Sequence, residues 1–113
     1  MTNYSPLSSP EDRRENFRLT YPQDYAPIIL LGGKVFNVKD ISEKGLRFEK
    51  DWLGKFLPNQ FVRATLVFPG GDRLELSGII VRIKEFDVAL LLVKRIPYQK
   101  ILNEQMIMRQ RNT

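Results

Sequence analysis

Between Arg18 and Val93 the apolar residues either alternate with polar ones or form short runs, and turns that contain glycine separate these runs. Alternation with a period of two is typical of β-strands, because successive side chains point to opposite faces of a sheet. No segment with helical spacing separates the strands, which excludes parallel βαβ units. The pattern therefore predicts an antiparallel, all-β domain.

Six or so strands are expected, and the Gly32-Gly33 pair is a clear hairpin signal between two of them. Short strands joined by tight turns favour closure of the sheet, so we expect a six-stranded antiparallel barrel over about residues 18–94. The segments with strand character are residues 18–21, 27–31, 34–42, 46–48, 61–68, 73–84 and 88–93.

The segment 73–84 changes its apolar face near Ser77-Gly78. We expect a β-bulge at Gly78 that keeps the apolar residues on both sides of it in the core. These residues are Leu74 and Leu76 before the bulge and Ile79, Val81 and Ile83 after it. Three phenylalanines also have the parity of core residues, namely Phe48, Phe61 and Phe68.

After the strands, Pro97 is followed by apolar residues at helical spacing, which predicts an α-helix over about residues 97–111. Because the segment 88–93 is apolar at every position, we expect this helix to cover the outer face of that strand. The long connection at 50–60 has apolar side chains that we expect to plug one end of the core: Trp52, Leu53 and Phe56.

The N-terminal residues are mostly small and polar and include prolines, so we predict a disordered tail over residues 1–12. A chain of 113 residues leaves room for one domain, which we place at 13–113. The sequence has no secretory signal and no run of about 18 apolar residues that spans a membrane, so we expect a cytoplasmic protein.

Cysteine and histidine are both absent from the sequence. Their absence excludes disulfides, thiolate nucleophiles and Cys-based zinc sites, and it removes the commonest general base. No pair of carboxylates is marked out for acid–base catalysis. The sequence therefore favours a binding module over an enzyme, and it predicts no metal site.

The net charge is +5, but the arginines form local clusters rather than one broad basic face. Such clusters suit a small anion better than a nucleic acid polymer. One cluster is Arg13-Arg14-Glu15-Asn16-Phe17-Arg18, which contains the pattern R-x-x-x-R from Arg14 to Arg18. A second short pattern, Asp40-Ile41-Ser42-Glu43-Lys44-Gly45, reads D-x-S-x-x-G and lies where a predicted strand ends.

In this order and spacing the two motifs resemble those of the PilZ domain, a bacterial receptor for the second messenger cyclic di-GMP. The resemblance runs from about Arg13 to the C-terminal helix, and the predicted strands fit that family's six-stranded barrel. It implies a cyclic di-GMP receptor with a flexible N-terminal arm that folds over the ligand. With room for only one domain, the output must pass through a protein partner or through self-association, and we expect an unidentified partner.

The residue types suit such a ligand. The planar fork of Arg14 or Arg18 can bind phosphate oxygens or guanine O6 and N7, and it can stack on a guanine. Asp40 can accept hydrogen bonds from a guanine edge, and Ser42 has the same strand parity and offers a hydroxyl. We expect Gly45 to turn with a positive φ and to let the ligand approach closely.

Three more arginines are candidate contacts. Arg47 is expected to face solvent beside the second motif. Arg82, on the outward face of its strand, lies near a place where the family often stacks a Trp or an Arg on a guanine. In the family, an Arg at the position of Arg13 goes with two intercalated ligands and an apolar residue goes with one. The resemblance therefore implies two cyclic di-GMP molecules per chain.

Each motif also has a plain structural interpretation. The arginine cluster is then a solvated, salt-bridged arm, and the second motif is a turn capped by its Asp or Ser side chain. Two other functions stay open: a PilZ protein that acts through protein contacts alone, and a small barrel that binds single-stranded nucleic acid. The last usually interleaves aromatic and basic side chains on one strand face, whereas the phenylalanines here are expected in the core.

Overall fold

The computed structural model of the chain describes residues 17–51 and 55–111. The predictions for the N-terminal tail and most of the arm, and those for Trp52 and Leu53, lie outside these residues. The described chain forms β1 (Leu19–Thr20), η2 (Gln23–Tyr25), β2 (Ile28–Leu31), β3 (Lys34–Ile41), β4 (Gly45–Glu49), β5 (Phe61–Val67), β6 (Arg73–Ile83), β7 (Asp87–Leu92) and α2 (Tyr98–Arg111).

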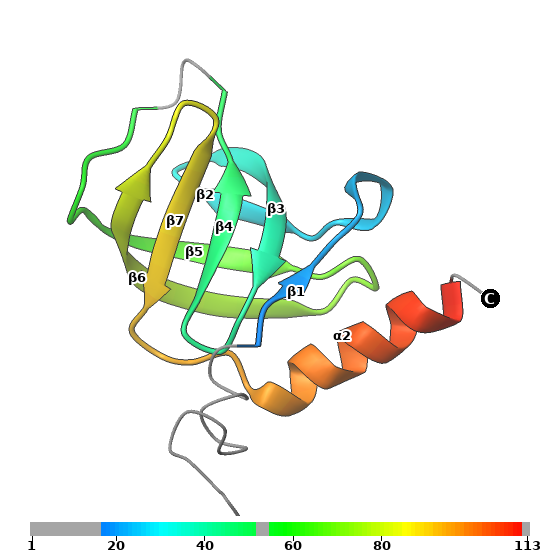
Figure 1. Cartoon of the computed structure of the whole chain (residues 1–113). Helices are drawn as coiled ribbons and strands as arrows, with labels where there is room; N and C mark the ends of the chain where they lie inside the picture. The colour runs from blue at the N-terminus through cyan, green and yellow to red at the C-terminus, as the bar shows by residue number, and fades with distance from the viewer. Residues whose placement is uncertain (1–16, 52–54, 112–113) are drawn as a thin grey trace, which may run out of the picture.

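The strands form one closed antiparallel barrel, as Figure 1 shows. Hydrogen bonds connect the strands in the order β3-β2-β5-β6-β7-β4, and β4 pairs back with β3 to close the ring. The two-residue β1 pairs with the end of β3, beyond the part that β2 covers. The predicted six-stranded antiparallel barrel is thus confirmed, with β1 as a short addition.

The barrel interior is filled by the inward-facing residues of alternating strand positions. Phe36 and Phe48 lie at its centre with ring centroids 5.4 Å apart, and Phe56 from the 55–60 connection packs against both at 5.6 Å. The prediction that Phe56 helps to plug the core is confirmed. The fully buried side chains are Phe48, Ile29, Ile41, Leu46, Leu66, Ile80, Leu90, Ile96, Ile101, Val38, Val88 and Asp40.

The prediction of a bulge at Gly78 is wrong, because the register of β6 against β7 shifts between Ile80 and Arg82. Gly78 itself points inward, where a Cβ would lie 2.5 Å from the carbonyl oxygen of Leu91. The glycine therefore permits a close approach of β7 and does not switch the face of β6. As a consequence, Ile79 and Val81 lie on the outer surface and not in the core.

Phe61 is also exposed, contrary to the expectation that it belongs to the core. Its neighbour Val62 takes the inward position, and Ala64 and Leu66 continue that alternation along β5. Phe48 and Phe68 are buried as expected. Of the three phenylalanines predicted to lie in the core, Phe61 therefore lies on the surface.

Helix α2 does not cover the outer face of β7, and Leu91 on that face is exposed. The helix lies instead across the end of the barrel, beside β1 (Figure 1). Its Lys100 Nζ is 2.5 Å from Asp72 in the β5–β6 turn and 4.4 Å from the centre of the Phe68 ring. The Arg111 guanidinium stacks 4.1 Å above the Tyr25 ring. In residues 17–51 and 55–111, no helix has the length and apolar character needed to cross a membrane.

A buried polar contact holds the helix in this position. The Tyr21 hydroxyl donates a hydrogen bond of 2.8 Å to Glu104 Oε1, and both side chains are almost inaccessible to solvent. Lys100 Nζ lies 3.8 Å from the other carboxylate oxygen of Glu104. Burial, and then the hydrogen bond to Glu104, raise the pKa of Tyr21 well above its ordinary value of 10.

We expect Tyr21→Phe to lower the free energy of unfolding by about 1–3 kcal/mol, because it leaves a buried carboxylate without its donor. The folded state holds the phenolic proton more tightly than the unfolded state does. The stabilisation is therefore complete below pH 10 and is lost as the pH rises beyond that value. The absorbance of ionised tyrosine is measured against pH, at alkaline pH, for the wild-type protein and for Tyr21→Phe. The difference between the two curves is the titration of Tyr21. A difference curve with its midpoint at pH 10 would contradict the buried hydrogen bond.

Candidate functional site

The second sequence motif forms the tight turn between β3 and β4. The Ser42 hydroxyl accepts a hydrogen bond from the Gly45 N–H and donates one to the Gly45 carbonyl, each at 3.2 Å. The Ser42 N–H also donates to the Gly45 carbonyl at 2.8 Å. The turn is tied to the end of β7, because the Leu92 N–H donates to the Lys44 carbonyl. The plain structural interpretation therefore accounts for part of the motif.

Asp40 lies next to this turn, and its side chain is completely buried. One carboxylate oxygen accepts a hydrogen bond of 2.5 Å from Arg18 Nη1. The other accepts from Arg47 Nε at 2.7 Å and lies 2.5 Å from Arg47 Nη2. Asp40 thus joins the residue before β1 to the middle of β4.

The two arginines are only partly removed from solvent, since their side chains are 45% and 39% exposed. The hydrogen bond to Asp40 is the main reason that the pKa of Arg47 is raised above its ordinary value. Each guanidinium has five N–H donors, and Asp40 engages only some of them. The remaining donors can bind an anion that arrives from solvent.

These residues line an open pocket of about 340 Å³ on the outer side of the barrel. The pocket gathers five of the eight residues predicted from the sequence: Arg18, Ser42, Gly45, Arg47 and Arg82. Asp40 lies beneath the lining and contacts it only through its arginines. Arg13 and Arg14 lie outside the described residues.

Gly45 has a different role from the one expected. It is not among the described residues with a positive φ, so the turn does not require a glycine for that reason. A Cβ at this position would instead lie 2.5 Å from the carbonyl oxygen of Leu90. The missing side chain lets β4 approach β7 and leaves space at the pocket wall.

Several other pocket residues were not predicted. They are Lys44 from the turn, Leu46 from β4, Val81 from β6, and Ala89, Leu90 and Leu91 from β7. The unbroken apolar run of β7 was the available signal, because it supplies apolar residues to both faces of that strand. Leu91 reaches the pocket because it is paired with Gly45 in the sheet. The sequence pattern alone does not predict which residues of two strands are paired.

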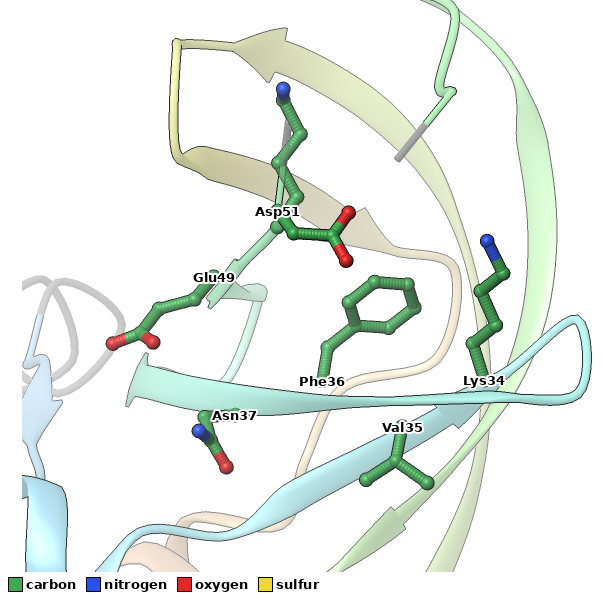
Figure 2. Close-up of a pocket in the computed structure, with 7 residues that line it drawn as sticks. Lys34, Val35, Phe36, Asn37, Glu49 and Asp51 are labelled. Atoms are coloured by element: carbon green, nitrogen blue, oxygen red, sulfur yellow. The ribbon is translucent and has the colours of Figure 1, made fainter. Parts of the chain in front are cut away.

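A second cavity of about 490 Å³ lies at the other end of β3, where Lys34, Glu49 and Asp51 contribute opposite charges. Figure 2 shows the Phe36 ring pointing toward Asp51, while Val35 lies on the other side of the strand. None of the predicted site residues lines this cavity. Its two carboxylates balance Lys34 and Lys50, so its lining has no excess of positive charge for an anion, and the arginine-lined pocket is the better candidate.

Across residues 17–51 and 55–111, no three Asp or Glu side chains come together in a way that could hold a metal ion. The polar side chains that line the pocket are three guanidinium groups, the ammonium group of Lys44 and the hydroxyl of Ser42. Such groups bind phosphate and the acceptor edge of guanine.

Comparison with known proteins agrees with the barrel and the motifs. The family model of the PilZ domain matches residues 12–101. The crystal structure of an uncharacterized Legionella protein resembles this one with a TM-score of 0.61 at 17% sequence identity, over 86% of this chain and 99% of that chain. At this identity the likeness shows the fold alone. None of the curated proteins matches the sequence.

We expect Gly45→Ala to lower the free energy of unfolding by about 1–3 kcal/mol, because its Cβ would collide with backbone on β7. Gly70→Ala is the matched control, since a Cβ there meets nothing within 4 Å and its φ is ordinary. Urea unfolding of both variants measures the difference. Equal stabilities for the two would show that β4 and β7 are not so closely packed.

Proposed function

Because the chain belongs to the PilZ domain family, a family of cyclic di-GMP receptors and not of enzymes, we propose that it binds cyclic di-GMP in the arginine-lined pocket and signals through a protein partner. The observation that carries this proposal is the convergence of Arg18, Arg47 and Arg82 on one pocket beside the D-x-S-x-x-G turn. Cyclic di-GMP offers two phosphates and two guanines, and guanidinium groups bind both.

In this proposal Asp40 acts on the ligand mainly through its arginines. Its two oxygens already accept hydrogen bonds from Arg18 and Arg47, and no part of its side chain is exposed. The two guanidinium groups are therefore held at the pocket before a ligand arrives, which reduces the conformational entropy lost on binding. A direct bond from Asp40 to a guanine, as expected from the sequence, requires one of these arginines to give way.

The proposal extends to the N-terminal arm. Arg18 lines the pocket, and Arg13 and Arg14 precede it in the sequence by five and four residues. Ligand phosphates would attract these two arginines, and the arm would close over the ligand. Such closure is the conformational change that we propose the partner senses.

We expect Arg18→Ala to weaken cyclic di-GMP binding by roughly 10- to 100-fold, since a hydrogen bond to a charged group contributes about 1.5–3 kcal/mol. Arg73→Ala is the matched control, because Arg73 is exposed at the start of β6 and does not line the pocket. Calorimetric titration measures both affinities, with GTP and cyclic AMP as competing nucleotides.

Two outcomes of this titration would replace the proposal. Wild-type protein that binds no cyclic di-GMP would indicate a PilZ domain that acts through protein contacts alone. Affinity for a single-stranded oligonucleotide that falls steeply with salt, without cyclic di-GMP binding, would indicate the nucleic acid function.

We further propose that two intercalated cyclic di-GMP molecules bind per chain and that Arg13→Leu reduces the number to one. Two ligands bring four phosphate charges together, and Arg13 supplies an additional cation beside them. Arg14 and Arg18 remain in the variant, so binding itself persists. The stoichiometry of a titration at protein concentrations well above the dissociation constant measures this. Saturation of the wild-type protein at one ligand would overturn the prediction.

A further inference from the structure

The outer face of β5, β6 and β7 carries a row of exposed apolar side chains. Phe61 is paired with Ile79, and Ile79 is paired with Leu91. Directly paired residues of an antiparallel sheet project to the same side, so the three side chains are neighbours. Val81 and Val93 extend the row along β6 and beyond β7, and each of the five is between 37% and 65% exposed.

This group, which we call the outer apolar strip, is unusual because its members are contiguous. Single exposed apolar residues are common on protein surfaces, whereas contiguous ones mark interaction sites. Figure 1 shows β5, β6 and β7 side by side, with α2 at another part of the barrel. The helix that was expected to cover β7 therefore leaves the strip open to solvent.

The charges around the strip are mainly basic. Arg63 is paired with Ser77, two residues along the strands from the pair of Phe61 and Ile79. Its neighbours on the outer face of β5, Phe61 and Thr65, are uncharged. Arg82 follows Val81, and the exposed Lys94 follows Val93. The nearest carboxylate on the outer face of β6, Glu75, accepts a hydrogen bond from Thr65.

We propose that the outer apolar strip is the docking surface for the effector, and that the effector presents a segment combining aliphatic or aromatic side chains with Asp or Glu. The apolar side chains would bury the strip, and the carboxylates would pair with Arg63 and Lys94. This deepens the proposed function, which leaves the effector's chemistry open, but the surface itself exists whether or not the nucleotide binds.

The same charges disfavour other occupants. A second copy of this chain related by a two-fold axis would bring Arg63 and Lys94 of both copies into one interface, where like charges repel. Single-stranded nucleic acid needs aromatic faces for its bases. Four of the five side chains in the strip are aliphatic, and only Phe61 is aromatic.

The strip is continuous with the arginine-lined pocket, because Val81 and Leu91 belong to both. An effector seated on the strip would therefore lie against the edge of a bound nucleotide. Cyclic di-GMP would change the effector's affinity through this shared border.

The experiment selects binders from a displayed library of random 12-residue peptides, using the immobilised full-length protein. We expect the enriched peptides to contain both apolar and acidic residues. The affinity of a synthetic enriched peptide should fall by at least about tenfold in Ile79→Asp, because a carboxylate would then be placed in the strip. It should fall comparably in Arg63→Glu, and lysine substitutions at the peptide's acidic positions should restore binding to that variant.

Matched controls separate the strip from the rest of the surface. Val35→Asp changes an exposed apolar residue outside the strip, and Arg73→Glu reverses a charge elsewhere on β6, so neither should alter peptide affinity. Thermal unfolding confirms that each variant folds. Ile79→Asp should bind cyclic di-GMP with the wild-type affinity, and Arg18→Ala should bind the peptide with the wild-type affinity. The two binding measurements therefore test the docking proposal and the nucleotide proposal separately.

Each remaining result would overturn the docking proposal. These results are no enriched peptide, enriched peptides that are basic or uncharged, and peptide affinity that is insensitive to Ile79→Asp. A wild-type dimer that Ile79→Asp converts to a monomer would assign the strip to a second copy of the chain. Oligonucleotide binding that Ile79→Asp and Arg63→Glu abolish would assign it to nucleic acid.

Discussion

The pairing of β4 with both β3 and β7 is the constraint on which the remaining structure depends. It closes the sheet and removes its open edges, which would otherwise be free to pair with other chains. It also places Arg47 between Asp40 on one side and Ala89 on the other. The pairing requires a residue without a side chain at Gly45, because the backbone of β7 lies too close for a Cβ. The D-x-S-x-x-G motif, which was interpreted as a ligand site, therefore also has a structural function.

The closed barrel creates the setting in which Asp40 has its effect. A carboxylate with no access to water needs compensation, which Arg18 provides from just before β1 and Arg47 provides from β4. The arginines themselves stay partly in water, so they keep donors for a second anion. One buried negative charge thereby orients two positive charges at the surface of the barrel.

The alternation of apolar residues was sufficient to predict the strands, their antiparallel arrangement and a closed barrel. It failed where the structure departs from regular pairing. Gly78 was interpreted as a bulge, although its small size serves the close packing of β7. The apolar run of β7 was interpreted as evidence of a covering helix, although Leu91 faces solvent. Of the motif residues, Arg18, Ser42 and Gly45 line one pocket, but the motifs do not contain Arg47, and the ion pairs of buried Asp40 with Arg18 and Arg47 form only in the folded chain.

The pairing of β4 with β7 also affects when the barrel can form during protein synthesis. β4 leaves the ribosome long before β7, its second partner, and until then one edge of β4 has nothing to pair with. Contacts between distant parts of a sequence form slowly, and unpaired edges promote aggregation in the meantime. The pocket is lined from Arg18 to Leu91, so a nascent chain cannot form it until its last strand has emerged. Under the proposed function, a chain truncated before β7 would therefore lack its binding pocket, and nucleotide binding would begin only once the barrel is complete.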